Sequence, residues 1–114
     1  MPRLNIPITQ ITNAGPTMPA EVTGVAADDL ELDPADTDVC WLEVRNSDSV
    51  TRDVVVDVNY AIDGFAIADM TYTVPIGGSK IIRLHPLSYF MQSDGKVYVN
   101  IDTSAVLHFR AFKL

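Results

Sequence analysis

Cysteine is almost absent from this sequence, and its scarcity excludes an internal disulfide. Cys40 stands alone among 114 residues. It falls on the apolar side of an alternating stretch, where a small buried side chain is far more common than a metal ligand or a nucleophile. We therefore expect a single domain, of residues 1–114, that is held together by its own apolar core and needs no metal or cofactor.

Basic residues are also scarce. Eight Lys and Arg stand against fifteen Asp and Glu, which gives a formal net charge of −7 and a pI near 4.4. Phosphate backbones are bound mainly by clustered Lys and Arg, so this balance argues against nucleic acid as a partner. An acidic surface favours solubility, and it suits a protein that is present at high local concentration.

Long apolar runs are missing as well. The sequence has no charged start followed by an apolar stretch, as a signal peptide has, and no apolar run approaches the length of a membrane span. We therefore expect neither membrane insertion nor secretion by a signal peptide, and a protein that is soluble where it is made.

Catalytic motifs are not found either. His85 precedes a proline and His108 falls on the polar side of the last strand pattern, and neither stands in a recognisable acid–base or metal arrangement. Serines such as Ser88 and Ser104 lack a Gly-x-Ser-x-Gly elbow, and the glycine pair at 77–78 does not precede a helix as a phosphate loop would. We expect no enzyme and no catalytic residue.

The sequence does contain a strong strand pattern, which is centred on residues 39–59. In residues 39–46, Cys40, Leu42 and Val44 alternate with residues that include charged ones, and residues 51–59 repeat the alternation with valines. Short polar residues between the two stretches suit a turn. We predict a β-hairpin here, whose two strands pair with each other and pack on further strands.

Further strand patterns follow at intervals of about ten residues. Turn residues separate them, as in the Asp-Gly pair at 63–64 and in residues 75–78 and 93–96, and no amphipathic helix interrupts the series. In all, about seven or eight short strands are expected, which is typical of a sandwich or a barrel. We predict an all-β fold, a two-sheet antiparallel β-sandwich that is Ig-like or jelly-roll-like.

The first 38 residues differ from the rest. Leu4, Ile6 and Ile8 alternate with other residues, but Pro7 cannot donate a ladder hydrogen bond and so places this strand at a sheet edge. Gly and Pro interrupt the chain before an acidic loop at 28–38. Two interpretations stay open. The segment closes its own sheet, or it is an arm whose Leu4, Ile6 and Ile8 add a strand to a neighbouring molecule.

The acidic loop holds six carboxylates between Asp28 and Asp38, and oxygen-rich loops can bind Ca²⁺. Its spacing lacks the D-x-D-x-D-G order of a calcium loop, and Pro34 stiffens its middle. A solvated loop without a metal is therefore the favoured interpretation.

Trp41 stands out among the aromatic residues, because alternation places it on the same side as Glu43 and Arg45. With several tyrosines it could form a sugar-stacking platform, as on many β-sandwich binding modules. Cover by a loop, by the N-terminal segment or by another subunit is the interpretation that we favour. Trp41 therefore joins the three N-terminal residues as a candidate interaction residue.

Four turn-rich stretches in the second half of the chain share features with one protein family. They are VNYAIDGFAIAD at 58–69, YTVPIGG at 72–78, LHPLSY at 84–89 and DGKVYV at 94–99. These stretches resemble small proteins encoded among the structural genes of tailed bacteriophages, which are generally regarded as head decoration or minor capsid proteins. The resemblance covers roughly residues 53–114, and Ile76 stands where the family often has a small residue.

The resemblance implies a structural virion protein without catalytic residues. Such a decoration, or cement, protein binds the major capsid protein on the outside of a phage head in many copies and stabilises the shell by mass action. It would be made in the host cytoplasm and reside on the capsid exterior, and self-association with closed symmetry, for example as a trimer, would suit it. Head–tail joining or tail positions fit these residues too. The alternative function is a non-catalytic carbohydrate-binding or adhesion module of a phage tail or surface assembly.

Overall fold

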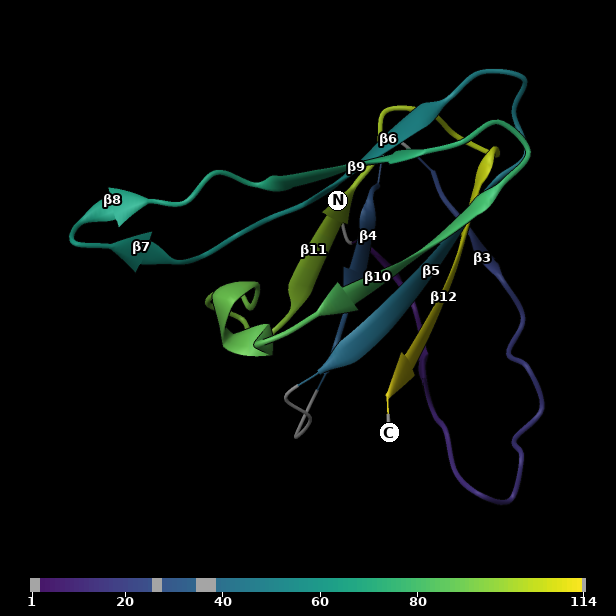
Figure 1. The fold of residues 1–114 in the computed structure, drawn as a ribbon, viewed down its shortest axis with the longest axis horizontal. Coiled ribbons are helices and arrows are strands. Elements are labelled where there is room, and N and C mark those ends of the chain that lie inside the picture. The colour runs from purple at the N-terminus through teal and green to yellow at the C-terminus, as the bar shows by residue number, and fades with distance from the viewer. Residues whose placement is uncertain (1–2, 26–27, 35–38, 114) are drawn as a thin grey trace.

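The computed structural model describes residues 3–25, 28–34 and 39–113, which fold into two facing β-sheets (Figure 1). The predicted all-β sandwich is confirmed. Within the described ranges, the one helical element is the 3-10 turn η1 (Leu87–Tyr89). The described strands number twelve, more than expected, because six of them are only two or three residues long and too short for an alternating pattern to reveal.

Each sheet is built from segments that lie far apart in the sequence. Sheet A has the order β1 (Leu4–Asn5), β4 (Leu30–Leu32), β11 (Val97–Asn100), β6 (Arg52–Val56) and β9 (Met70–Val74). Sheet B has the order β10 (Ser79–Leu84), β5 (Cys40–Asn46), β12 (Leu107–Lys113) and β2 (Ile8–Gln10). The short strand β3 (Val22–Thr23) pairs with β12 as well, on the side away from β5.

The apolar core lies between the two sheets, and period-two alternation places its residues there. In β5, for example, Cys40, Leu42 and Val44 are fully buried, while the residues between them are only partly covered. The facing strands follow the same rule, with Val54 and Val56 buried on β6. The inward faces that the sequence predicts are therefore confirmed for these central strands.

The predicted hairpin of residues 39–59 is wrong in its pairing. Strand β5 belongs to sheet B, where it pairs with β10 and β12, and β6 belongs to sheet A, where it pairs with β9 and β11. The turn between β5 and β6 therefore crosses from one sheet to the other. Both strands have an apolar face that must be buried, and facing each other across the core buries both faces.

Asn46 holds this sheet-crossing corner together. It is fully buried, and its amide Nδ2 donates hydrogen bonds to the carbonyl oxygens of Val50 at 2.9 Å and Val74 at 3.2 Å. Its Oδ1 accepts a hydrogen bond from the backbone N–H of Asp48 at 2.9 Å. The β9–β10 connection also crosses between the sheets, so Asn46 ties two corners to each other.

The N-terminal segment closes both sheets of its own domain. Strand β1 is the edge of sheet A and β2 lies at an edge of sheet B, so the edge placement expected from Pro7 is confirmed. Ile6, between the two strands, is buried in the core, and its N–H donates to the carbonyl of Glu31. Strand β1 runs parallel to β4 and β2 runs parallel to β12, so the sandwich is not antiparallel throughout.

The acidic stretch is not the continuous solvated loop that was predicted. Leu30 and Leu32 are fully buried residues of the strand β4, and Glu31 between them is partly covered. Three residues of alternation are too few to distinguish this strand from a loop. Glu31 forms an ion pair of 2.7 Å with Lys96. Of the remaining stretch, residues 35–38 lie outside the described residues.

Candidate functional site

A pocket of about 570 Å³ lies on the outer face of sheet B, beneath the loop that follows β2. Outward-facing residues of four strands form its floor and the loop forms its roof, and most of its accessible surface is apolar. Its lining residues are Thr9, Ile11, Thr12, Gly15, Pro16, Thr17, Met18, Pro19, Trp41, Glu43, Ile81 and Phe112.

Trp41 lies on this face with Glu43 and Arg45, as the alternation predicts, and it is partly covered. Of the three expected sources of cover, the structure has the loop of residues 11–19, which belongs to the N-terminal segment. The glycine and prolines of this loop do not continue a strand, so it crosses the sheet as a cover. The cover is incomplete, because Ile81 at the rim is 69% exposed.

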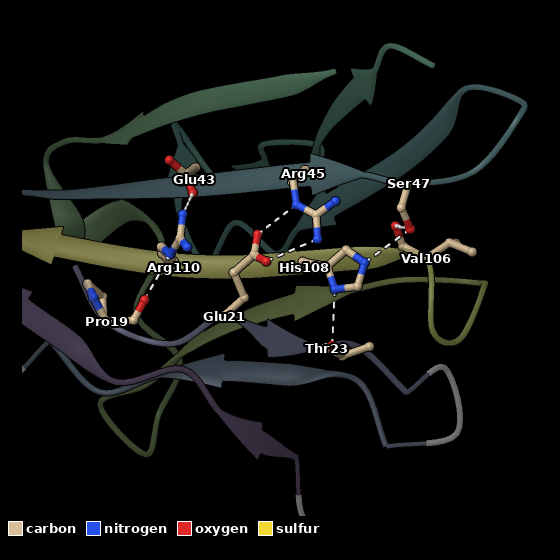
Figure 2. Close-up of polar contacts among 9 residues, drawn as sticks. All are labelled: Pro19, Glu21, Thr23, Glu43, Arg45, Ser47, Val106, His108 and Arg110. Carbon is tan, nitrogen blue, oxygen red and sulfur yellow. Dashed lines mark hydrogen bonds and ion pairs between the residues drawn. The ribbon is translucent and has the colours of Figure 1, made fainter. Parts of the chain in front are cut away.

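A ladder of polar contacts pins this loop to the sheet, as Figure 2 shows. The guanidinium of Arg110 on β12 donates from Nη1 to Glu43 on β5 at 2.9 Å and from Nε to the carbonyl of Pro19 at 2.9 Å. One cation thus links two strands of the floor to the end of the roof. Arg110 therefore fastens one end of the loop over the floor of the pocket.

The next rung is the ion pair between Glu21 and Arg45, which form two hydrogen bonds of 2.8 and 3.0 Å. The hydrogen bonds from Arg45 hold the pKa of the Glu21 carboxyl below its ordinary value. Because Glu21 directly precedes β3 and Arg45 lies on β5, the pair fastens the end of the loop to sheet B across β12.

The third rung contains His108, whose ring lies between two hydroxyl groups. Nε2 is 3.1 Å from the Ser47 hydroxyl, and Nδ1 is 3.0 Å from the Thr23 hydroxyl. The Ser47 hydroxyl also donates to the carbonyl of Val106 at 3.2 Å. The His108 ring thus joins Thr23 of β3 to Ser47, which directly follows β5.

The other predicted interaction residues lie within the domain's own packing. Ile6 is in the core, and Leu4 and Ile8 pack against it from β1 and β2. The structure places Ile8 in sheet B and Leu4 in sheet A, so only Trp41 is at the pocket. Contact of the three N-terminal residues with a partner stays a prediction.

A second surface, the hairpin of β7 (Ala61–Ile62) and β8 (Phe65–Ala66), projects from the sandwich (Figure 1). Asp63 and Gly64 form its predicted turn, and both have positive φ angles, of 52° and 83°. Phe65 is 77% exposed and Ile62 is 55% exposed, and every residue from 59 to 70 is exposed. The projecting tip is therefore a solvent-exposed apolar surface.

The base of this hairpin is fastened to η1. The rings of Tyr60 and Tyr89 stack with their centroids 4.0 Å apart, and the Asn59 N–H donates to the Tyr89 carbonyl at 2.8 Å. The Asp69 carboxylate accepts from the N–H of Val58 at 2.9 Å, which joins the two ends of the hairpin segment. The apolar tip is thus presented on an ordered stem.

Sequence reasoning recognised the turn of this hairpin and did not identify the hairpin as an interaction surface. The signal that could have identified it is the position of Ile62 and Phe65 directly beside the turn. Each lies in a strand of only two residues, and a hairpin that short cannot bury either side chain. The pocket could not have been found in this way, because its floor comes from four strands that only the fold brings together.

The described part of the chain contains no group of three or more His, Cys, Asp or Glu residues placed to hold a metal ion. Cys40 is buried, and its burial raises the pKa of the thiol. Among the residues with described positions, no helix has the length and apolar character needed to cross a membrane.

No family model matches this chain, and no curated protein or solved structure is significantly similar to it.

Proposed function

We propose that this chain is a structural virion protein, a decoration protein that binds the outside of a phage head in many copies and stabilises the shell. The observation that supports this proposal best is the projecting β7–β8 hairpin with its exposed apolar tip. The residues that resemble phage head proteins include this hairpin, at 58–69. Its partners would be the major capsid protein and further copies of the chain.

The hairpin suits a contact element for physical reasons. Burying a side chain such as Phe65 or Ile62 stabilises the buried state by about 1.5–3 kcal/mol relative to exposure. An assembled particle supplies neighbours that can cover such side chains, and the same gain is repeated at each symmetry-related position. Any chain that binds the assembled shell and not its free subunits stabilises the shell by mass action.

Charge is compatible with this role. The net charge of −7 keeps the free chain soluble despite its exposed apolar tip. Electrostatic repulsion between the tip and an acidic partner surface would be small, because Asp63 is the one charged residue between Ala61 and Ala66. The free protein can therefore stay in solution before it binds the shell.

A reconstitution experiment tests the proposal. Heads prepared without this chain are incubated with purified protein, and the bound copies per shell subunit are measured after sedimentation. We expect saturable binding at a fixed ratio to the major capsid protein and raised thermal stability of the heads. Phe65→Asp should bind fewer copies, whereas Ile76→Asp, at an exposed apolar residue of the β9–β10 turn, should bind as wild type does.

Lack of saturable binding by the folded wild-type chain would contradict the proposal. Equal loss of binding by Phe65→Asp and Ile76→Asp would contradict the role of the hairpin, since it would indicate a nonspecific effect of added charge.

The Trp41 pocket favours a second candidate function, a non-catalytic recognition module for carbohydrate or for an adhesion partner. Its volume falls in the range of about 300–1,000 Å³ that is common for small-ligand sites. Sugars need hydrogen-bond partners as well as an aromatic face, and the carboxylate of Glu43 is already bonded to Arg110. Glycan binding that Trp41→Ala abolishes would support this function, and a blank glycan array would count against it.

A further inference from the structure

The two apolar surfaces lie on different sides of the molecule. Figure 1 shows the β7–β8 hairpin projecting on one side of the sandwich, while the loop that follows β2 and roofs the Trp41 pocket lies on the other. Phe65 stands at the hairpin's tip, and Ile81 stands at the pocket's rim. Because of this separation, the hairpin cannot fill the pocket of its own chain.

A residue of the hairpin and a residue beside the pocket carry opposite charges. Residues 57–69 contain three Asp and no Lys, Arg or His, and Asp63 lies in the turn at the tip. Beside the pocket, Arg83 of β10 is in register with Trp41 of β5, and it is exposed on the same side of the strand as Ile81. Arg83 Nη2 lies 3.4 Å from Nδ1 of the His85 ring. The charged residue that lines the pocket itself is Glu43, and its carboxylate is paired with Arg110. Asp63 at the tip and Arg83 beside the pocket therefore form one pair of opposite charges next to the two apolar surfaces.

From this match we propose that the pocket receives the β7–β8 hairpin of a second copy of this chain, with Phe65 inserted beside Trp41 and Asp63 near Arg83. The proposed contact rests on the proposed function for its biological setting, and it specifies that one partner of the chain is a second copy of the same chain. The pocket volume of about 570 Å³ has room for an aromatic side chain together with its apolar neighbours.

The interface is heterologous, because the inserted surface and the receiving surface are different. Each copy in such a contact keeps one free hairpin or one free pocket for the next copy. Repetition either closes into a ring or continues as an open chain, depending on the rotation between copies. Both outcomes place many copies in contact with one another, as a covering of a shell requires.

Mass measurement in solution, by sedimentation or light scattering over a series of concentrations, tests the inference. The wild-type chain should self-associate, and added salt should weaken the association. Phe65→Asp and Ile81→Asp should each weaken it by roughly 30-fold or more, the factor expected when a central interface side chain is lost. Ile76→Asp is the matched control, because Ile76 is 59% exposed and lines neither surface, and its association should equal that of wild type.

Mixing the two weakened variants distinguishes this contact from other interfaces. Phe65→Asp keeps an intact pocket and Ile81→Asp keeps an intact hairpin. At a concentration at which each variant alone is monomeric, an equimolar mixture should therefore form one-to-one dimers. A symmetric interface that used the same patch twice would show no such rescue. Circular dichroism of each variant confirms that it is folded.

A wild-type chain that stays monomeric at every concentration would overturn the inference, and so would a mixture without rescue. These failures are distinct from failure of the proposed function. A monomeric chain that nevertheless saturates phage heads would overturn only the contact between copies. A chain that self-associates through hairpin and pocket but does not bind heads would overturn only the virion role.

Discussion

Replacing Asn46 by alanine is expected to destabilise the sandwich strongly, although the side chain lies in no candidate site. The variant loses two hydrogen bonds that the amide donates and one that it accepts. Each is worth about 0.5–1.5 kcal/mol net, and a buried carbonyl left without a donor costs about 1–3 kcal/mol. The Val74 bond is the fully buried one, so we expect a total loss of about 2–4 kcal/mol.

The assay is urea unfolding followed by the fluorescence of Trp41, the one tryptophan in the chain. The midpoint should fall while the denaturant slope stays constant. Asn59→Ala is the matched control, because the Asn59 amide makes a single, exposed hydrogen bond, and it should change stability by no more than about 0.5 kcal/mol. A loss below about 1 kcal/mol for Asn46→Ala would refute the role of this amide in joining the two corners.

Three further predictions concern the N-terminal segment, the ladder and the thiol. Ile6→Ala should cost about 2–5 kcal/mol in urea unfolding because Ile6 is a core residue, whereas Ile11→Ala, at an exposed position, should cost no more than about 0.5 kcal/mol. The pKa of Glu21 is lowered from 4.5 in the folded state, so its stabilising effect is present above that pH and is lost as the pH falls through the folded pKa. Glu21→Gln should therefore lower stability at neutral pH and make the remaining stability less sensitive to acid. Urea titrations of both proteins, at neutral pH and at an acidic pH below the folded pKa of Glu21, would show this. Burial raises the pKa of Cys40, so a thiol reagent should modify it only as fast as the domain opens, and rapid reaction in native buffer would contradict its placement.

The sequence was informative about which residues face inward. Alternation in Cys40, Leu42 and Val44 correctly predicts a buried face, because period two is a property of the strand itself. It does not identify the strand's neighbours, since pairing depends on the whole topology. For this reason β5 and β6, which are adjacent in sequence, lie in different sheets.

The candidate site was predictable only in part. Trp41 could be placed on the outer face, but its cover comes from a loop more than twenty residues earlier in the sequence. The roof is held there by Arg110, from the last strand, through contacts that no local pattern contains. The exposed tip of the β7–β8 hairpin was missed. A turn motif shows that the chain reverses direction, but it does not show whether other residues pack against the hairpin.

The measurement that tests the central claim most directly is the number of copies of this chain in a purified phage particle. Quantitative mass spectrometry against the major capsid protein provides this ratio. The proposed function predicts a fixed ratio in which this chain covers the shell at symmetry-related positions. A few copies per particle would place the chain at a vertex or the tail instead, and its absence from the particle would contradict the virion role.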